Sequence, residues 1–334
     1  MDENFKNQYH ELLYQYLLEK DERQLFYAKQ FSKKLIESNI SPDEALLFHL
    51  QSMQKKYDLP PVWKDSFKFF LEFMVQYSLV YQKREALLSE QKKIEAELSL
   101  AESVQQSLLP DTENLLLPKD VDLGVISVAA RKVSGDFYNI KTYDQGIEIA
   151  VADVAGKSIP AAIIMSMMQF VMESTEDCQQ PHTVLELLNR FLYKKSEASM
   201  FVTMFWGDYY APNGHFYYSN AGHEPALFYQ AKEDRFINLS TDGCALGLTM
   251  RYGYNTQSVY LEPGDFILLY TDGVIETRDS ESIDDNEILR HFLRKINLSQ
   301  NCQQIVEQLH QYILGINGLN IPDDQTILLF RKLS

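Results

Sequence analysis

The chain has 334 residues, of which 45% are hydrophobic and 23% are charged, an ordinary balance for a globular protein. This length predicts about two domains. The formal net charge of -16 argues against general binding to nucleic acid or to an anionic membrane, since both partners are themselves negative. A phosphorylated substrate would need local neutralisation, for example by a metal ion.

No apolar run is long enough to span a bilayer, and the first residues do not form a basic segment followed by an apolar one. The three cysteines, Cys178, Cys244 and Cys302, are widely spaced and odd in number. Such usage is typical of thiols in a reducing compartment rather than of a disulfide framework. We therefore expect a soluble, cytoplasmic protein with no nucleic-acid or membrane partner.

Residues 1–80 are predicted to form an all-α N-terminal bundle of about four helices. Glycine is absent from residues 1–109, and apolar residues recur at helical spacing. The sequence Ser-Pro-Asp-Glu beginning at Ser41 is typical of a helix start, with a capping residue followed by proline.

Residues 81–120 are predicted to be a linker that begins with a long, charged helix, which Pro110 ends. Apolar residues repeat every seven positions along it, but two of the three intermediate positions are the polar Gln91 and Gln105; the apolar set is Leu87, Ile94, Ala101 and Leu108, with Leu98 at the third intermediate position. This weak seam leaves two interpretations open: a dimeric coiled coil and a solvated helix packed on its own domain.

Residues 121–334 are predicted to form an α+β domain. Strand-like runs alternate with turn residues at Val125–Ala130, Ile147–Asp153, Phe201–Tyr210, His215–Asn220, Leu227–Gln230, Phe266–Tyr270 and Thr326–Phe330. Helical stretches are expected at Pro160–Met172, Thr183–Lys195 and about 286–314. Several strands follow one another as hairpins, which favours antiparallel layers over alternating βαβ units.

Four aspartates of this domain, Asp136, Asp153, Asp272 and Asp323, each lie at or just past a strand-like run, beside a small or turn-forming residue. A single aspartate of this kind is commonly a turn or helix cap. Carboxylates are also the ligands that Mg²⁺ and Mn²⁺ prefer, and two such ions about 3.5–4 Å apart can activate a water molecule against phosphorus. Four such residues in one domain favour the metal site.

Five motifs in the C-terminal part occur in a fixed order: Ser134–Tyr138, Asp153–Ala162, Asn220–Pro225, Tyr270–Glu276 and Asp323–Thr326. Together they resemble the bacterial SpoIIE-type branch of the PPM (PP2C-like) serine/threonine phosphatases. The resemblance implies an α-β-β-α sandwich, preceded here by the helical bundle and the linker helix, with two Mn²⁺ or Mg²⁺ ions at one edge.

The resemblance also implies roles for individual residues. Asp153 would bridge both ions and the carbonyl of Val154 would be a further ligand. Asp272 and Asp323 would complete the second site, and Asp136 would support an accessory metal. Asp323 is preferred to Asp324, which becomes a supporting or capping residue. No catalytic side chain is expected, because a metal-bound water is the nucleophile and no covalent phosphoenzyme forms.

Two features depart from the family pattern. Gly156-Lys157-Ser158 stands where the family usually has Gly-Lys-Gly, and Val154-Ala155 occupies the stretch where eukaryotic relatives carry a histidine that serves as a candidate general acid. His223 is the alternative histidine, and we interpret it as a hydrogen-bonded turn residue outside the site.

The N-terminal helices and linker extend the resemblance to phosphatases that activate a general stress sigma factor. It implies dephosphorylation of a phosphorylated anti-sigma factor antagonist, a kinase-like protein activator on residues 1–80, and homodimerisation through the linker helix. Two alternatives stay open: a non-catalytic signalling scaffold that retains the PPM fold, and a two-metal phosphoesterase that acts on small molecules.

Overall fold

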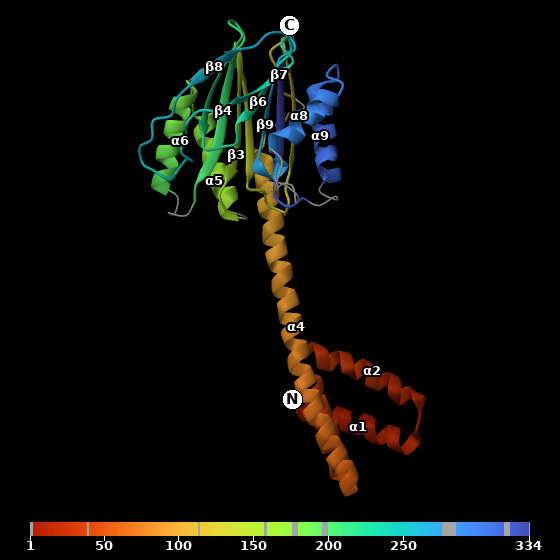
Figure 1. Cartoon of the computed structure of the whole chain (residues 1–334). Helices are drawn as coiled ribbons and strands as arrows, with labels where there is room; N and C mark the ends of the chain where they lie inside the picture. The colour runs from red at the N-terminus through yellow and green to blue at the C-terminus, as the bar shows by residue number, and fades with distance from the viewer. Residues whose placement is uncertain are drawn as a thin grey trace. The chain divides into compact units, whose positions relative to one another are not determined.

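The computed structural model describes residues 3–38, 40–112, 114–156, 159–175, 180–195, 200–275, 285–316 and 321–333. The chain divides into two compact units, residues 1–94 and 95–334 (Figure 1). The long helix α4, Pro61–Leu108, belongs to both units and continues without a break through the expected boundary at residue 80. No glycine or proline interrupts its interior, so nothing in the local sequence ends the helix there.

The first unit is helical. It contains α1 (Glu3–Glu19), α2 (Glu22–Glu37), α3 (Pro42–Lys56) and the first part of α4. Ser41 caps α3 as expected, and its hydroxyl and the Glu44 carboxylate form a reciprocal capping box. Phe31 and Phe48 are buried, and the Tyr9 ring packs against both of them. Local capping and a small aromatic core therefore define this unit.

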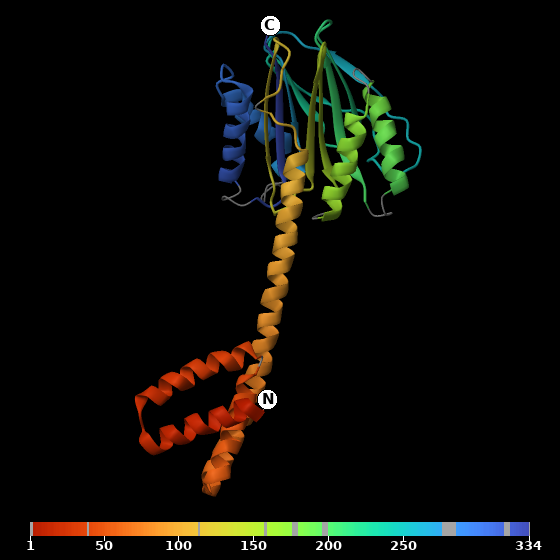
Figure 2. The same cartoon turned by 180° about the vertical axis from the view of Figure 1, so that it is seen from behind.

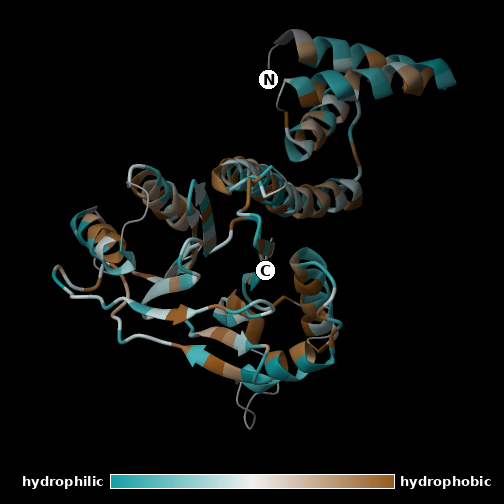
Figure 3. Ribbon diagram, turned by 90° about the horizontal axis from the view of Figure 1, so that it is seen from above, coloured by the Kyte–Doolittle hydropathy of each residue, from teal (hydrophilic) through white to brown (hydrophobic). Residues whose placement is uncertain are grey.

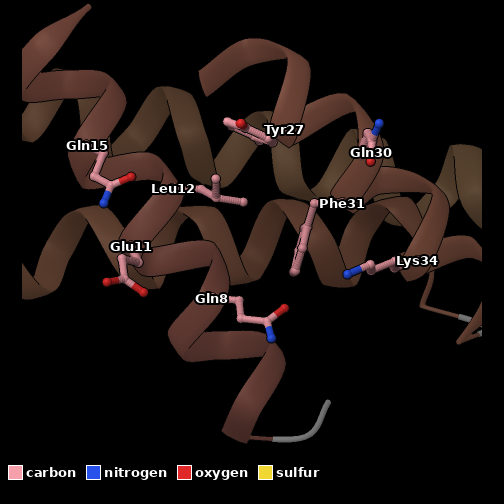
Figure 4. Close-up of a pocket in the computed structure, with 8 residues that line it drawn as sticks. All are labelled: Gln8, Glu11, Leu12, Gln15, Tyr27, Gln30, Phe31 and Lys34. Atoms are coloured by element: carbon pink, nitrogen blue, oxygen red, sulfur yellow. The ribbon is translucent and has the colours of Figure 1, made fainter. Parts of the chain in front are cut away.

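A surface groove of about 320 Å³ lies between α1 and α2 (Figure 4). Gln8, Glu11 and Gln15 of α1 line one side, and Gln30 and Phe31 of α2 line the other. Most of these side chains are polar, which is typical of a solvated surface groove rather than of a buried ligand cavity.

The second unit contains two five-stranded antiparallel sheets. Sheet A has the order β1-β10-β9-β6-β7, and its strands are β1 (Val121–Val128), β6 (Ala226–Gln230), β7 (Arg235–Leu239), β9 (Phe266–Tyr270) and β10 (Gln325–Lys332). Sheet B has the order β2-β3-β4-β5-β8, with β2 (Asp136–Tyr143), β3 (Gly146–Val154), β4 (Val202–Tyr210), β5 (His215–Ala221) and β8 (Gln257–Tyr260).

Helices cover the outer face of each sheet (Figures 1 and 2). On sheet B, α5 (Ile159–Glu173) and α6 (Pro181–Lys195) pack over residues such as Trp206. On sheet A, the short α7 (Asp272–Ile275), α8 (Asp285–Lys295) and α9 (Cys302–Ile316) pack over residues such as Leu268. A third apolar cluster, including Phe216 and Phe330, fills the space between the sheets.

Hydrophobic residues are distributed along the strands of both sheets (Figure 3). On β3, Ile149 faces the inter-sheet core, whereas Ala150 faces α5 and α6. Both faces of the strand are therefore buried, which explains why its sequence is almost continuously apolar.

The expected α-β-β-α sandwich with helices before it is confirmed. The structure adds β2, β7 and β8, which the sequence did not predict, and the single helical stretch expected over 286–314 is two helices, α8 and α9. None of the described helices is long and apolar enough to cross a membrane. Cys244 and Cys302 are free thiols, and Cys178 lies outside the described residues.

Candidate metal centre

Asp136 and Asp153 lie side by side at one end of strands β2 and β3 of sheet B. Together with the residues of sheet A that contact them, they form an acidic edge of the sandwich. Asp136 is the first residue of β2, and it pairs directly with Asp153 near the end of β3. The Val154 N–H donates to the Gly135 carbonyl at 3.0 Å and extends this pairing beyond the strand. The antiparallel register therefore brings two expected ligands to the same place, although 16 positions of hairpin lie between them in the chain.

Gly135 leaves space beside two oxygen atoms of this edge. A Cβ atom at Gly135 would lie 3.2 Å from Asp153 Oδ1 and 3.4 Å from the Val154 carbonyl oxygen. Both oxygen atoms therefore face the position where any residue other than glycine would carry its side chain. Carboxylate and carbonyl oxygens are the donors that Mg²⁺ and Mn²⁺ take in proteins.

Thr271 connects sheet A to this edge. Its hydroxyl donates to Asp136 Oδ2 at 2.6 Å and accepts from the Thr326 N–H at 2.9 Å. Asp272 follows immediately as the first residue of α7. A Cβ atom on Gly273 would lie 2.1 Å from the Asp324 carbonyl oxygen, so only glycine fits there. Asp272 is thereby held beside the segment that carries Asp323 and Asp324.

The two adjacent aspartates of the last motif have different surroundings. Asp324 is buried, and its carboxylate accepts from the N–H groups of Ala130 and Gly135, the second at 2.5 Å. Asp323 is half-buried, and its Oδ1 accepts from the Asp324 N–H at 2.9 Å. Asp324 therefore organises backbone around the edge, and Asp323 remains the predicted ligand of the pair.

The electrostatics of the edge favour a cation. Burial raises the pKa of Asp136 well above its usual range, and the nearby Asp153 and Asp324 carboxylates raise it further, whereas hydrogen bonds from Thr271 and Thr326 oppose the shift. A bound cation would relieve this repulsion. The donor set and its charge thus fit Mg²⁺ or Mn²⁺.

Asp153, Asp272 and Asp323 are half-buried, whereas Asp136 is only 4% exposed. Throughout the described ranges, no group of three or more His, Cys, Asp or Glu side chains is close enough together to hold an ion by itself. Mg²⁺ usually keeps several waters and takes only one or two carboxylates directly, so the arrangement is compatible with ions that also use carbonyl, water and substrate oxygens.

His223 is buried and contacts residues of both sheets, and the sequence analysis placed it outside the site. Its Nδ1 is 2.9 Å from the hydroxyl oxygen of Thr203, the residue that pairs with Asp153 across β3 and β4. Burial lowers the pKa of His223 to about 4, and a hydrogen bond with the Tyr270 backbone opposes the shift. The imidazole is therefore a neutral contact between β9, which precedes Asp272, and β4, which pairs with the strand that carries Asp153.

Of Gly156-Lys157-Ser158, which departs from the family pattern, the structure describes only Gly156. Gly156 has a φ of +128°, a conformation that favours glycine. Lys157, Ser158 and Glu276 belong to the motifs but lie outside the described residues.

Comparison with known families gives two matches along the chain. Residues 143–333 match the family described as stage II sporulation protein E. Residues 7–80 match the N-terminal domain family of the phosphoserine phosphatase RsbU. The chain is also 35% identical to phosphoserine phosphatase RsbU of Bacillus subtilis, over 99% of this chain and 98% of that protein.

Solved structures of PP2C domains match part of the chain. The SiaA PP2C domain of Pseudomonas aeruginosa has a TM-score of 0.63 and 21% identity, over 72% of this chain and 98% of that one. The PP2C phosphatase domain of SpoIIE from Bacillus subtilis, with a fragment of its regulatory domain, has a TM-score of 0.55 and 17% identity, over 63% of each chain. At these identities the structures show a shared fold.

Proposed function

The chain belongs to the SpoIIE-type family of PPM (PP2C-like) phosphatases, and from that premise we propose that it dephosphorylates a phosphorylated anti-sigma factor antagonist with the help of two Mn²⁺ or Mg²⁺ ions. The reaction is hydrolysis of a phosphoserine or phosphothreonine ester. Its outcome would be positive regulation of a stress sigma factor by partner switching. A cytoplasmic location belongs to the same proposal, because sigma factors act where transcription takes place.

The observation that carries the proposal is the acidic edge shared by the two sheets. Asp136 and Asp153 are strand partners, and the Thr271 hydroxyl bridges Asp136 to the segment that contains Asp272. The Thr271–Thr326 hydrogen bonds continue this connection to the segment that contains Asp323. These contacts between segments that are distant in sequence support the proposal of a common metal site.

In the proposed site, Asp153, the Val154 carbonyl, Asp272 and Asp323 would hold the two ions, and Asp136 would support an accessory one. When bound, the ions would acidify water and neutralise the phosphoryl oxygens. The protein orients these ligands through Thr271, which fixes the Asp136 carboxylate, and through Asp324, which fixes two backbone N–H groups. His223 is neutral and buried, so no proton transfer is assigned to it.

The first unit offers a surface for the proposed kinase-like activator. Phe70, Phe73, Tyr77 and Tyr81 form a stacked row along α4, with successive ring centroids 6.4 Å apart. Each of these side chains is about half exposed, from 46% for Phe70 to 55% for Phe73 and Tyr77. Exposed aromatic rows of this kind are typical of protein-binding surfaces. Homodimerisation through the linker helix is part of the same proposal, because Leu87 and Ile94 are also exposed.

The function is tested with the full-length chain, Mn²⁺ and a phosphoserine-bearing anti-sigma factor antagonist. We expect phosphate release that depends on Mn²⁺ and that Asp272→Asn abolishes. The exposed Asp242→Asn, which makes the same chemical change at a residue outside the proposed ligand set, should leave it intact. No release from any phosphoprotein, even with an activator present, would support a scaffold. Comparable turnover of nucleotides or sugar phosphates would support a small-molecule phosphoesterase.

A further inference from the structure

Gln105 on α4 contacts the segment that leads into the acidic edge. Its Nε2 donates to the Ser134 carbonyl at 2.8 Å, and its Oε1 accepts from the Ser134 N–H at 3.0 Å. The side-chain amide thus pairs with both polar groups of one backbone residue, as a neighbouring strand would. Gln105 is 6% exposed, and its Nε2 also lies 2.8 Å from Met165 Sδ on α5.

The sequence assigned a different role to this residue. Gln105 is one of the two polar positions that weaken the seven-residue seam of the linker helix. In the structure its side chain is buried within the second unit, so it is not available to a seam between helices. A long polar side chain is buried at low cost only where all its polar atoms find partners, and the Ser134 backbone supplies them.

Ser134 is connected directly to the edge. Its hydroxyl accepts from the Asp136 N–H at 3.0 Å. The next residue, Gly135, donates its N–H to Asp324 and accepts from Val154 N–H. Residues 134–136 are therefore held by Asp324, the β3 backbone, Thr271 and Gln105. Of these, Gln105 alone comes from α4.

We propose that Gln105 is a positioning residue: it holds the Ser134–Asp136 segment in the conformation in which Asp136 and the space beside Gly135 are ready for divalent ions. The inference rests on the proposed metal-dependent function. Loss of this contact leaves the ligands in place but lets the segment move, so the site binds ions more weakly. Saturating metal then restores the segment and most of the activity.

The variant that isolates the two hydrogen bonds is Gln105→Met, because methionine has a similar length and helix propensity but can form neither bond. Gln106→Met is the matched control, since Gln106 is the neighbouring residue of the same type and is exposed. Gln105→Glu keeps the acceptor for the Ser134 N–H but places an oxygen against the Ser134 carbonyl. It should weaken Mn²⁺ binding at least as much as Gln105→Met, because it buries a carboxylate oxygen against an acceptor.

Three measurements on the full-length chain are needed. Calorimetric Mn²⁺ titration should show roughly tenfold weaker binding for Gln105→Met, in the range found for residues that support metal ligands. The half-saturating Mn²⁺ concentration for phosphatase activity should rise by the same factor, while kcat at saturating Mn²⁺ stays within about twofold. Hydrogen exchange should accelerate at residues 134–136, and Gln106→Met should match the wild type in all three.

A purely structural role predicts a lower melting temperature with unchanged Mn²⁺ affinity and unchanged exchange at residues 134–136, and that result overturns the inference. If Gln105→Met does not fold, Gln105→Leu, which is shorter and also forms neither bond, serves for the same comparison. A wild-type protein that binds Mn²⁺ but hydrolyses no phosphoprotein would refute the proposed function, while calorimetry and exchange would still decide the role of Gln105.

Discussion

Asp136 and Asp153 face each other as strand partners at the end of the β2–β3 hairpin, and this pairing places two carboxylates at one edge of the sandwich. Elsewhere in a sheet, like charges directly opposite each other are unfavourable. Here Thr271 donates to one of the pair, and the Gly135 backbone leaves room beside the other. The arrangement costs local stability, which is expected of the proposed metal site.

Asp153→Asn should abolish Mn²⁺-dependent phosphatase activity while leaving the fold intact. The change removes the charge of the expected bridging ligand and keeps the size of the side chain. Removing the charge should also relieve repulsion with Asp136, so the melting temperature without metal should not fall. Asp144→Asn, in the exposed turn of the same hairpin, is the matched control and should retain full activity. Activity near that of the wild type in Asp153→Asn would remove Asp153 from the site.

Gly135→Ala should weaken Mn²⁺ binding with little effect on stability. The added methyl group would stand 3.2 Å from Asp153 Oδ1 and 3.4 Å from the Val154 carbonyl, which is tight but tolerable packing in the space expected to receive an ion. Calorimetric titration with Mn²⁺ measures the effect, with unfolding in denaturant as the control for stability. Unchanged Mn²⁺ affinity would show that this space does not serve the ions.

Gly273→Ala is the contrasting change. Its methyl group would lie 2.1 Å from the Asp324 carbonyl oxygen, so the backbone must move. We expect a loss of about 1–3 kcal/mol or more in the free energy of unfolding, as for overpacked sites. Denaturant titration of the two glycine variants side by side measures the difference, and equal stability would contradict the tight packing of Gly273 on the last motif.

His223 should remain neutral throughout the physiological pH range. Burial lowers the pKa of the imidazole to about 4, below its ordinary value of 6.5. The folded state therefore disfavours the protonated form, and the stability that the neutral ring contributes is present above pH 6.5 and lost as the pH falls toward 4. NMR titration of the ring measures this directly, and a midpoint near 6.5 would be incompatible with the buried environment.

Asp208→Asn should stabilise the protein at neutral pH. Burial raises the pKa of Asp208 from 3.8 to about 6, and the hydrogen bond from the Tyr143 hydroxyl only partly opposes this shift. The wild-type carboxyl favours folding fully below pH 3.8, and this contribution is lost as the pH rises through 6. Asparagine keeps an acceptor for Tyr143 without the buried charge. The variant should therefore gain up to about 2–3 kcal/mol above pH 6 and nothing below pH 4.

The sequence by itself determined the features that depend on neighbouring residues. The capping box at Ser41, most strands and the antiparallel α+β class follow from capping residues, periodicity and turn residues, which act over a few positions. The strand β2 was missed because it mixes apolar residues with Asn139 and Lys141. The strands β7 and β8 were missed because they are short strands at the sheet edges in which polar residues interrupt the apolar ones.

Tertiary structure alone decided what the aspartates and Gln105 contact. Asp136 meets Thr271 across 135 positions of sequence, and Gly135 meets Asp324 across 189. Such contacts depend on the register of two packed sheets, which no local pattern encodes. Gln105 illustrates the same limit, because its spacing along the helix suggested a seam, whereas burial and a two-bond contact with Ser134 join it to the acidic edge.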